Sequence, residues 1–536
     1  MARKDTENPD TAAERYRELI GRTFPQAVKN GKIDFDSLLT LLGAPPEERF
    51  RFCWPGKSRA EQLAQTPPDG ALLPLLQESE AWETTRNLYI EGDNLEALKL
   101  LQPEFAGKIR VIYIDPPYNT GNDFIYRDDY RERCASCPGR GAGCEDAGRY
   151  HAGWLNLMYP RLLLAKKLLA PDGVIFISID DCELANLKKI CCEVFGEKNY
   201  INLITVKTKT SSGASGGGED RRLKKNTEYL LIYVGSRGKI RLNPPQTKIP
   251  ISEYIFSHRQ SGTGFFYTRI LEDCGEKALL CEQDGLKIYT HRNFRFSTVC
   301  EKMKAEGLTL DETYSRYFDR IFMVTNAQTS LLEKVNRAVP GEKILVSYEY
   351  VPRSGRNKGK PAVKYVWNRT MVVWLADSAV KENGAVYKTC CLGTMWDDIS
   401  WGRLDLEGGV PFKNGKKPLR LLERLLQMAD GKDSTVLDFF SGSATTAHAV
   451  MAQNARDGGT RRFIMVQIPE SCEKDPAAAA AGYRNICEIG KARIRLAAKK
   501  IRAQMPGGQP LPDFGFRVYR IVQKDGSDGT CGLAEK

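Results

Sequence analysis

The chain has 536 residues, 42% of them hydrophobic, which is enough to bury a large core and more than one ordinary domain needs, so we expect two or three domains. Its formal net charge of +12 favours a polyanionic partner such as nucleic acid, although a basic surface that only serves solubility predicts the same value. The absence of an apolar run near ~20 residues and of an apolar leader in MARKDTENPD argues against membrane-spanning and secreted proteins, and predicts a cytoplasmic chain with reduced cysteines.

Residues 1–85 predict a small helical region, because apolar residues recur there at helical spacing between prolines. Within it, Pro55-Gly56-Lys57-Ser58 resembles the end of a phosphate-binding loop. Such a loop also requires a glycine five residues before Gly56, where this chain has Arg51. We therefore reject an ATP site and assign this region no chemistry.

From Leu88 the pattern changes to short apolar runs that alternate with helical segments, which is typical of strand-helix-strand units in a parallel sheet. Because the runs are apolar throughout, we expect strands that are covered on both faces. The expected strands are residues 88–90, 109–114, 174–179, 229–234, 436–440 and 463–468. They divide between residues 86–235 and 391–505, and the intervening residues 236–390 break the alternation and look inserted.

One motif indicates chemistry: Asp115-Pro116-Pro117-Tyr118 directly follows an apolar strand. Proline cannot continue a central strand, so Asp115 lies at the strand's carboxyl end, where open parallel sheets place their ligands. An ordinary turn is the alternative, although chance produces this tetrapeptide in only on the order of one in several hundred chains of this length.

These residue types suit methylation of an aromatic amine, whose lone pair is delocalised into the ring and is a poor nucleophile. The Asp115 carboxylate and the Pro116 carbonyl can each accept one amine hydrogen, and rigid Pro116 and Pro117 hold both acceptors in place. Tyr118 can stack on a base that has been flipped out of the duplex. The motif resembles the Asp-Pro-Pro-Tyr signature of amino-methyltransferases that act on adenine.

A second segment resembles the cofactor motif of the same family, a strand followed by a Phe-x-Gly-x-Gly turn that opens a helix. Here the last glycine is Ala444, which has less φ freedom. The resemblance implies S-adenosylmethionine as cofactor, and Glu470 after the next strand as a partner of its ribose. Asp93 is equally a helix N-cap or a cofactor contact. The other implied cofactor residues are Asp438, Phe440, Gly442, Ser443 and Thr445.

The motif order, catalytic before cofactor with an insert between, resembles the permuted β-class of these enzymes. It implies a Rossmann-like α/β methyltransferase fold in which residues 236–390 form the target-recognition domain. Two lead-in segments, Trp396 to Ile399 and Lys417 to Glu423, also match, although helical spacing indicates that most of the second packs in the core. Gly515-Phe516-Arg517-Val518 resembles a late motif of Type III modification subunits. Residues 506–536 are expected to form a tail, without the longer C-terminal region of such subunits.

The resemblance therefore implies a site-specific DNA methyltransferase that transfers a methyl group to adenine N6, as the modification component of a restriction-modification system. It implies double-stranded DNA as partner, a homodimer and a restriction subunit. Cytosine N4 methylation, a recognition subunit with an inactive transferase, and methylation of RNA or protein remain alternatives. Cytosine C5 methylation is excluded because its nucleophilic Cys normally follows Pro, and no Pro-Cys pair occurs.

Two further groups of residues have open interpretations. Cys134, Cys137, Cys144 and His151 supply four ligand types for a structural zinc, or they are reduced thiols in a loop that contacts DNA. In the insert, basic residues alternate with aromatic ones, which predicts either phosphate contact with base stacking or a solvated loop. The residues of this second group are Arg353, Arg356, Lys358, Lys360 and Lys364, with Tyr348, Tyr350, Tyr365 and Trp367.

Overall fold

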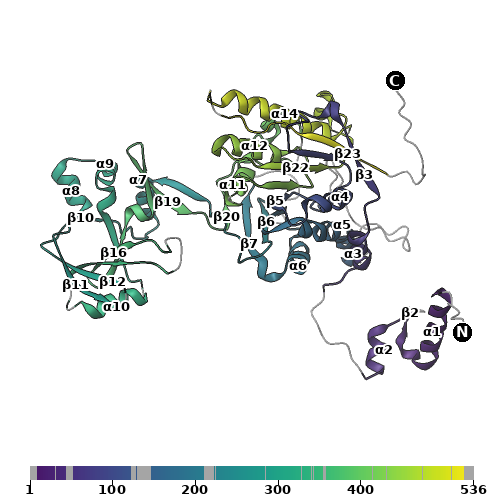
Figure 1. Cartoon of the computed structure of the whole chain (residues 1–536), viewed down its shortest axis with the longest axis horizontal. Helices are drawn as coiled ribbons and strands as arrows, with labels where there is room; N and C mark the ends of the chain where they lie inside the picture. Colours follow the sequence, from purple (N-terminus) through teal and green to yellow (C-terminus); the bar gives the residue numbers. More distant parts are fainter. Residues whose placement is uncertain are drawn as a thin grey trace.

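The computed structural model consists of a large α/β body, an inserted body on one side and a small N-terminal unit on the other (Figure 1). The structure describes residues 9–29, 32–43, 52–121, 128, 147–209, 223, 225–283, 285–327, 329–339, 341, 343–353, 358–412, 415–429, 431–473, 475–506, 508 and 510–523. Among these residues, no helix is both long enough and apolar enough to cross a membrane. Their cysteines are all free thiols.

The large body is built on a ten-stranded sheet with the order β20-β7-β8-β6-β5-β21-β22-β4-β23-β3. The neighbouring strands from β6 to β23 are parallel, whereas β8 runs antiparallel to β6. All six strands expected from apolar runs lie in this sheet, which confirms the Rossmann-like α/β fold. The strands are β3 (Gly70–Pro74), β4 (Leu88–Glu91), β5 (Ile109–Ile114), β6 (Leu169–Ile179), β7 (Tyr200–Lys207), β8 (Thr227–Val234), β20 (Met395–Trp396), β21 (Thr435–Asp438), β22 (Arg462–Gln467) and β23 (Arg517–Gln523).

Helices cover both faces of the sheet. Successive side chains of a strand point to opposite sides, so a strand that is apolar throughout has apolar side chains to bury on each face. Along β5, Ile112 and Ile114 join the core on one face, and Val111 and Tyr113 join the core on the other. The first face is covered by α3 (Lys57–Gln65), α4 (Asn94–Phe105), α5 (Ala147–Leu168) and α6 (Leu184–Phe195). The second is covered by α11 (Leu419–Ala429), α12 (Thr445–Asp457) and α14 (Ile486–Gln504).

The strands β5 and β21 lie side by side in the middle of the sheet, with Val111 opposite Val436. From β5 the chain passes through α5 to β6, and from β21 it passes through α12 to β22, which lies on the other side. The two connections therefore leave in opposite directions and cover opposite faces of the sheet. This divergence is a topological switch point, and it opens a crevice at the carboxyl ends of the two strands.

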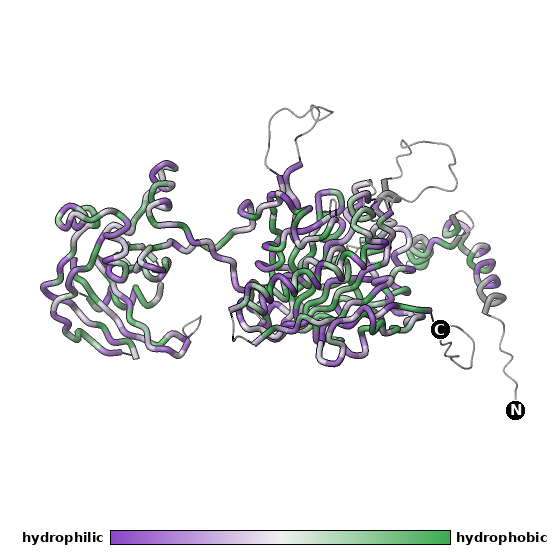
Figure 2. Tube along the Cα trace, turned by 90° about the horizontal axis from the view of Figure 1, so that it is seen from above, coloured by the Kyte–Doolittle hydropathy of each residue, from purple (hydrophilic) through white to green (hydrophobic). Residues whose placement is uncertain are grey.

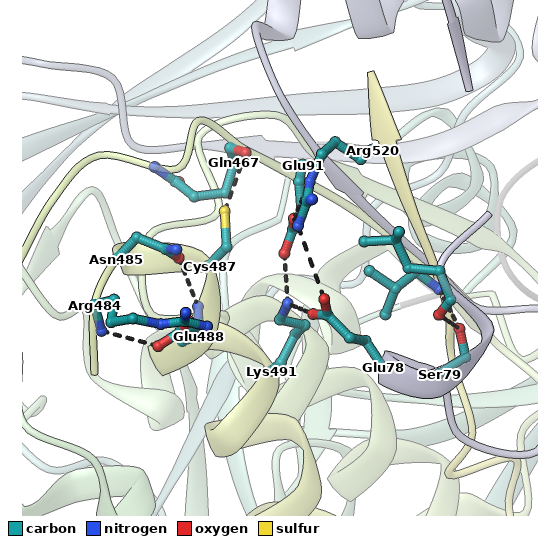
Figure 3. A network of polar contacts seen from close by, with 12 residues as sticks. Glu78, Ser79, Glu91, Gln467, Arg484, Asn485, Cys487, Glu488, Lys491 and Arg520 are labelled. Carbon is teal, nitrogen blue, oxygen red and sulfur yellow. Dashed lines mark hydrogen bonds and ion pairs between the residues drawn. The ribbon is translucent and has the colours of Figure 1, made fainter. Parts of the chain in front are cut away.

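One edge of the sheet differs from the expectation, because β3 lies in the stretch expected to be helical and β23 in the expected tail. A buried lysine of α14 ties this edge together (Figure 3). Lys491 pairs with Glu91 of β4 and with Glu78, and Arg520 of β23 also pairs with Glu91 at 2.9 Å. β3 is short and lies between prolines, and in β23 arginines interrupt the apolar residues, so neither strand gives a continuous apolar run.

The inserted body is an eight-stranded antiparallel sheet with the order β11-β12-β15-β16-β17-β14-β10-β13. A narrow neck joins it to the large body (Figure 2), and its two ends meet where the Leu392 amide donates to the Pro245 carbonyl at 2.9 Å. Its strands are β10 (Arg269–Asp273), β11 (Glu276–Gln283), β12 (Leu286–Arg292), β13 (Arg295–Thr298), β14 (Ile321–Thr325), β15 (Leu345–Tyr350), β16 (Ala362–Trp367) and β17 (Thr370–Trp374). The neck strands are β9 (Gln246–Pro250), β18 (Ala379–Glu382) and β19 (Ala385–Cys391).

Smaller elements complete the chain. The helices α7 (Ile251–Gln260), α8 (Val299–Glu306), α9 (Leu310–Arg316) and α10 (Ser330–Ala338) belong to the insert, and α13 (Pro476–Ala480) lies between β22 and α14. The N-terminal unit contains α1 (Pro9–Thr23), β1 (Val28–Lys29), β2 (Lys32–Ile33) and α2 (Phe35–Leu41).

Within the insert, Tyr348 is 2% exposed in a core cluster, so it is not available to stack on a base. Arg356 lies outside the described residues.

Candidate active site

A cavity occupies the switch point, between the carboxyl ends of β5 and β21. Asp115 and Pro117 line it from β5, and Phe440 and Gly442 line it from the turn after β21. Four carboxyl groups and two cations belong to its lining, which favours a cationic ligand. These charged residues are Asp93, Asp115, Asp438, Glu470, Arg161 and Lys417.

Asp115 belongs to a buried polar cluster of four side chains. The ammonium of Lys417 lies 3.0 Å from Asp115 Oδ1 and 3.2 Å from Glu228 Oε2. The hydroxyl of Tyr118 donates to the same two oxygens, at 2.8 and 3.1 Å. Lys417 is 8%, Asp115 16% and Glu228 23% exposed, so little water competes for these contacts. The Lys417 ammonium also lies 4.9 Å from the centre of the Tyr118 ring.

Burial and opposite charges act against each other in this cluster. Burial raises the pKa of Asp115 above its usual value, and Glu228 adds to that rise, whereas Lys417 and the Tyr118 hydroxyl oppose it. Burial acts to lower the pKa of Lys417, but the carboxylates of Asp115 and Glu228 outweigh it and raise that pKa. Lys417 is therefore protonated at neutral pH and serves as the counter-ion of Asp115.

The two proline carbonyls of the motif have different surroundings. Trp154 of α5 donates its indole hydrogen to the Pro117 carbonyl at 2.7 Å. The turn that follows is held by Asn119, which has a φ of +61° and donates from its side chain to Glu183 at 2.7 Å. Because Trp154 occupies the Pro117 carbonyl, the Pro116 carbonyl is the better candidate to accept an amine hydrogen.

The turn after β21 brings its backbone to the cavity. Gly442 has a φ of +49°, and its amide donates to the side-chain oxygen of Gln467 at 2.7 Å. Ala444 also has a positive φ, +59°, although it replaces the glycine of the family motif. It is the N-cap residue of α12 and is fully buried. The chain therefore adopts the glycine-like turn at a conformational cost of roughly 1–2 kcal/mol for alanine.

The side chains of this turn face different directions. Asp438 accepts from the Thr446 hydroxyl at 2.5 Å and from the Phe440 amide at 3.1 Å, and its burial raises its pKa to about 7. The hydroxyls of Ser443 and Thr445 accept from the fully buried guanidinium of Arg493, at 3.0 and 2.7 Å. Ser443 and Thr445 therefore hold the turn against α14, and both also line the cavity together with Phe440 and Gly442.

Asp93 caps a helix, which is one of the two roles that the sequence left open, and it also lies at the cavity. Its side chain caps α4 by accepting from the amides of Leu95 and Glu96, at 2.9 and 3.1 Å. It also lines the cavity and accepts from Arg161 at 2.9 Å. Glu470 lines the same cavity after β22.

The zinc candidates Cys134, Cys137 and Cys144 lie outside the described residues, and the interpretation stays open. The fourth candidate, His151, is described, and its Nδ1 lies 2.8 Å from Glu183 Oε1. Within the described parts of the chain, no three His, Cys, Asp or Glu side chains gather as metal ligands do.

Sequence reasoning missed Glu228 and Arg493, and it interpreted Lys417 as part of a packing segment. Glu228 is the second residue of β8, 110 residues after Tyr118, and nothing in the neighbouring sequence distinguishes it. The one usable signal was the Lys-Pro pair at Lys417, because a lysine next to a helix-starting proline in a matching lead-in segment is a candidate site residue.

Comparisons with known proteins agree with this geometry. The N6/N4 family model described as DNA methylase matches residues 109–479, which is more than half of the chain. The probable type III restriction-modification enzyme HindVI Mod subunit of Haemophilus influenzae is 38% identical over 82% of this chain and 55% of its own length. The type III StyLTI Mod subunit of Salmonella typhimurium is 32% identical over 87% of this chain and 65% of its own.

The type III EcoPI Mod subunit of Escherichia phage P1 is 30% identical over 96% of this chain and 78% of its own length. The chain thus spans between about half and two thirds of the first two relatives, and more of the third.

Proposed function

Because the chain belongs to the N6/N4 DNA methylase family, we propose that it transfers a methyl group from S-adenosylmethionine to the N6 amine of adenine in DNA. The supporting observation is the single cavity that Asp115 and the Gly442 turn share at the switch point of the sheet. A methyl donor and an acceptor base must meet within bonding distance, and this cavity provides both halves of such a site.

The lining of the cavity fits a cationic nucleoside. Its four carboxyl groups outnumber its two cations, and both cations are already paired, Arg161 with Asp93 and Lys417 with Asp115. Phe440 offers an aromatic surface, and Glu470 follows β22 at the position where Rossmann-like folds bind ribose hydroxyls. When bound, S-adenosylmethionine supplies an electrophilic methyl group on a positively charged sulfur.

On the acceptor side, Asp115 and the Pro116 carbonyl each accept one hydrogen of the adenine amine. Their fixed positions turn the nitrogen lone pair towards the cofactor side of the cavity, so that transfer is direct and needs no covalent enzyme intermediate. Tyr118 stacks on the extruded base. Its hydroxyl contacts with Asp115 and Glu228 hold the ring in place before the base arrives.

The partners follow from this function. Double-stranded DNA is the substrate, and the inserted body, residues 236–390, recognises the target sequence. The basic residues Arg353, Lys358 and Lys360 contact its phosphates. The Mod names of the relatives support a restriction subunit as partner, and we expect a homodimer that acts in the cytoplasm.

Transfer of tritiated methyl groups to unmethylated DNA tests this function. Wild-type protein labels DNA, whereas Asp115→Ala labels it at least about 10²-fold more slowly, because the amine loses its charged acceptor. A matched control is Asp69→Ala, since Asp69 is an exposed aspartate outside the cavity. Equal labelling by the wild-type protein and Asp115→Ala would show that the proposed site is wrong.

The chemical identity of the product separates the alternatives. Digestion of the labelled DNA yields N6-methyladenine if the proposal is right and N4-methylcytosine if the other amine is the target. Parallel reactions with RNA and protein identify a different polymer substrate. DNA binding without any labelling would favour a recognition subunit with an inactive transferase. Sequencing of methylated positions in DNA from an expressing host gives the target site.

A further inference from the structure

We infer that Lys417 and Glu228 are positioning residues that set the charge and the orientation of Asp115 for methyl transfer. This inference rests on the proposed function and deepens it, because it assigns roles to two side chains that the motif does not contain. The three residues come from separate segments: Asp115 follows β5, Glu228 lies in β8, and Lys417 precedes α11.

The contacts make one oxygen of Asp115 structural and leave the other for the amine. Both the Lys417 ammonium and the Tyr118 hydroxyl bind Oδ1, at 3.0 and 2.8 Å. The lysine has three hydrogens to donate, but the hydroxyl has only one, so it serves Asp115 and Glu228 in turn. With Oδ1 occupied, the carboxylate plane is held and Oδ2 is the acceptor presented to the cavity.

The cluster also sets the charge of Asp115. The carboxylates of Asp115 and Glu228 are buried and close together, so they repel each other. Without a cation between them, one of the two would take up a proton. Lys417 is that cation. The other groups that face Asp115 are Tyr113, Tyr118 and Asp438, and none of them carries a positive charge. Lys417 therefore keeps Asp115 ionised before the reaction.

An ionised Asp115 is needed because the reaction releases a proton. The amine nitrogen bonds to the methyl carbon while the carbon–sulfur bond breaks and its electron pair stays on sulfur. The nitrogen is then positively charged and carries one hydrogen too many. Asp115 Oδ2 accepts that hydrogen as a proton, and the neutral carboxylic acid passes it to water. Its pKa, already raised by burial, favours this transfer.

The pH dependence of methyl transfer separates this role from simple packing. Activity is lost as pH falls through the pKa of Asp115. Lys417→Met removes the stabilising cation, raises that pKa and moves the acid limb of kcat/KM to higher pH by about one unit or more. Glu228→Gln removes a repelling charge and moves the same limb to lower pH. The double variant, whose cluster has the same net charge as the wild-type cluster, returns towards the wild-type limb. Lys417→Arg retains most activity.

Lys491→Met is the matched control, because Lys491 is also a buried lysine between two carboxylates but does not line the cavity. It lowers thermal stability and leaves the acid limb in place. The inference is overturned if the acid limbs of Lys417→Met and Glu228→Gln coincide or move in the same direction. It is also overturned if the acid limb of Lys491→Met moves as far as that of Lys417→Met.

Thermal unfolding provides a readout that does not need activity. The double variant Lys417→Met, Glu228→Gln unfolds at a higher temperature than Lys417→Met alone, because one uncompensated carboxylate has been removed. A wild-type protein that labels no DNA would contradict the proposed function, and the pairing would then be judged by this rescue alone. Strictly additive unfolding temperatures of the two single variants would overturn the pairing itself.

Discussion

Two buried lysines of this protein, Lys417 and Lys491, have similar charged neighbours but lie in different parts of the large body. Lys417 and Lys491 are 8% and 4% exposed, and each lies between two carboxylates. Lys491 joins β4, α14 and the segment before β4, where helix and strands pack around it, and Arg520 adds a further charge. Lys417 borders the cavity at the switch point.

The difference lies in what surrounds each cluster. Around Lys491 the carboxylates of Glu78 and Glu91 join α14 to β4 and to the segment before it (Figure 3), and neither of them lines the cavity. Around Lys417 the partner carboxylate Asp115 also faces open space, so one of its oxygens is available to a ligand. A buried ion cluster therefore indicates a functional site only when a cavity touches it, because structural ion pairs perturb pKa values in the same way.

The greatest loss of activity is expected from Asp115, the carboxylate at the cavity. Asp115→Asn lowers the single-turnover rate of methyl transfer on the order of 10³-fold, because the amide lacks the negative charge and cannot take the proton. Glu91→Gln, the counterpart beside Lys491, leaves the rate of the folded protein within about threefold. Both rates are measured below the unfolding temperature of each variant. A comparable loss in Glu91→Gln would mean that the two clusters are not functionally distinct.

The next largest effect is on the free energy of unfolding, which we expect to fall more for Lys491→Met than for Lys417→Met. Lys491→Met lowers the free energy of unfolding by about 3 kcal/mol, since it leaves Glu91, 3% exposed, with Arg520 as its one remaining ion-pair partner among the described residues. Lys417→Met costs less, because the carboxylates that it leaves unpaired, Asp115 and Glu228, are 16% and 23% exposed, against 3% for Glu91. Urea unfolding of both variants at pH 7 gives the two values. The interpretation fails if Lys417→Met is the more destabilised protein.

Asp438, which lines the cavity, makes the stability of the protein depend on pH. Its pKa is raised to about 7, so the folded state binds a proton that the unfolded state has already released, and stability falls as pH rises from about 4 to 7. Asp438→Asn removes this contribution. Between pH 5 and pH 8 the variant loses about 2–3 kcal/mol less unfolding free energy than the wild type. Parallel curves for the two proteins in urea unfolding would contradict the burial assigned to Asp438.

The smallest effect concerns the turn that replaces glycine by Ala444. Ala444→Gly relieves the positive φ but removes a buried methyl group worth about 0.8 kcal/mol, so the free energy of unfolding changes by less than about 1 kcal/mol. Ala447→Gly is the control, because Ala447 is equally buried in α12 and has helical geometry. It should destabilise the protein by about 1–2 kcal/mol, and equal losses in both variants would rule out strain at Ala444.

The sheet was largely predictable from local pattern, because strands such as β5 and β22 are buried on both faces and are apolar at almost every residue. Asp115 was predictable for a related reason: the prolines that follow it must end the strand. The cluster around Asp115 was not, since Glu228 and Lys417 reach it from distant segments and carry no periodic signal. Ser443 and Thr445 were expected at the ligand and do line the cavity, whereas the buried Arg493 that holds them comes from the distant helix α14 and was not expected.

The neck of the inserted body makes this body easy to exchange in evolution. Because Pro245 and Leu392 are joined by one hydrogen bond, the chain leaves the large body and returns to it at almost the same point. Any folded module whose ends lie equally close can be grafted there without altering the strand order of the main sheet. Such an exchange would replace the whole inserted body and leave the cavity at the carboxyl ends of β5 and β21 unchanged.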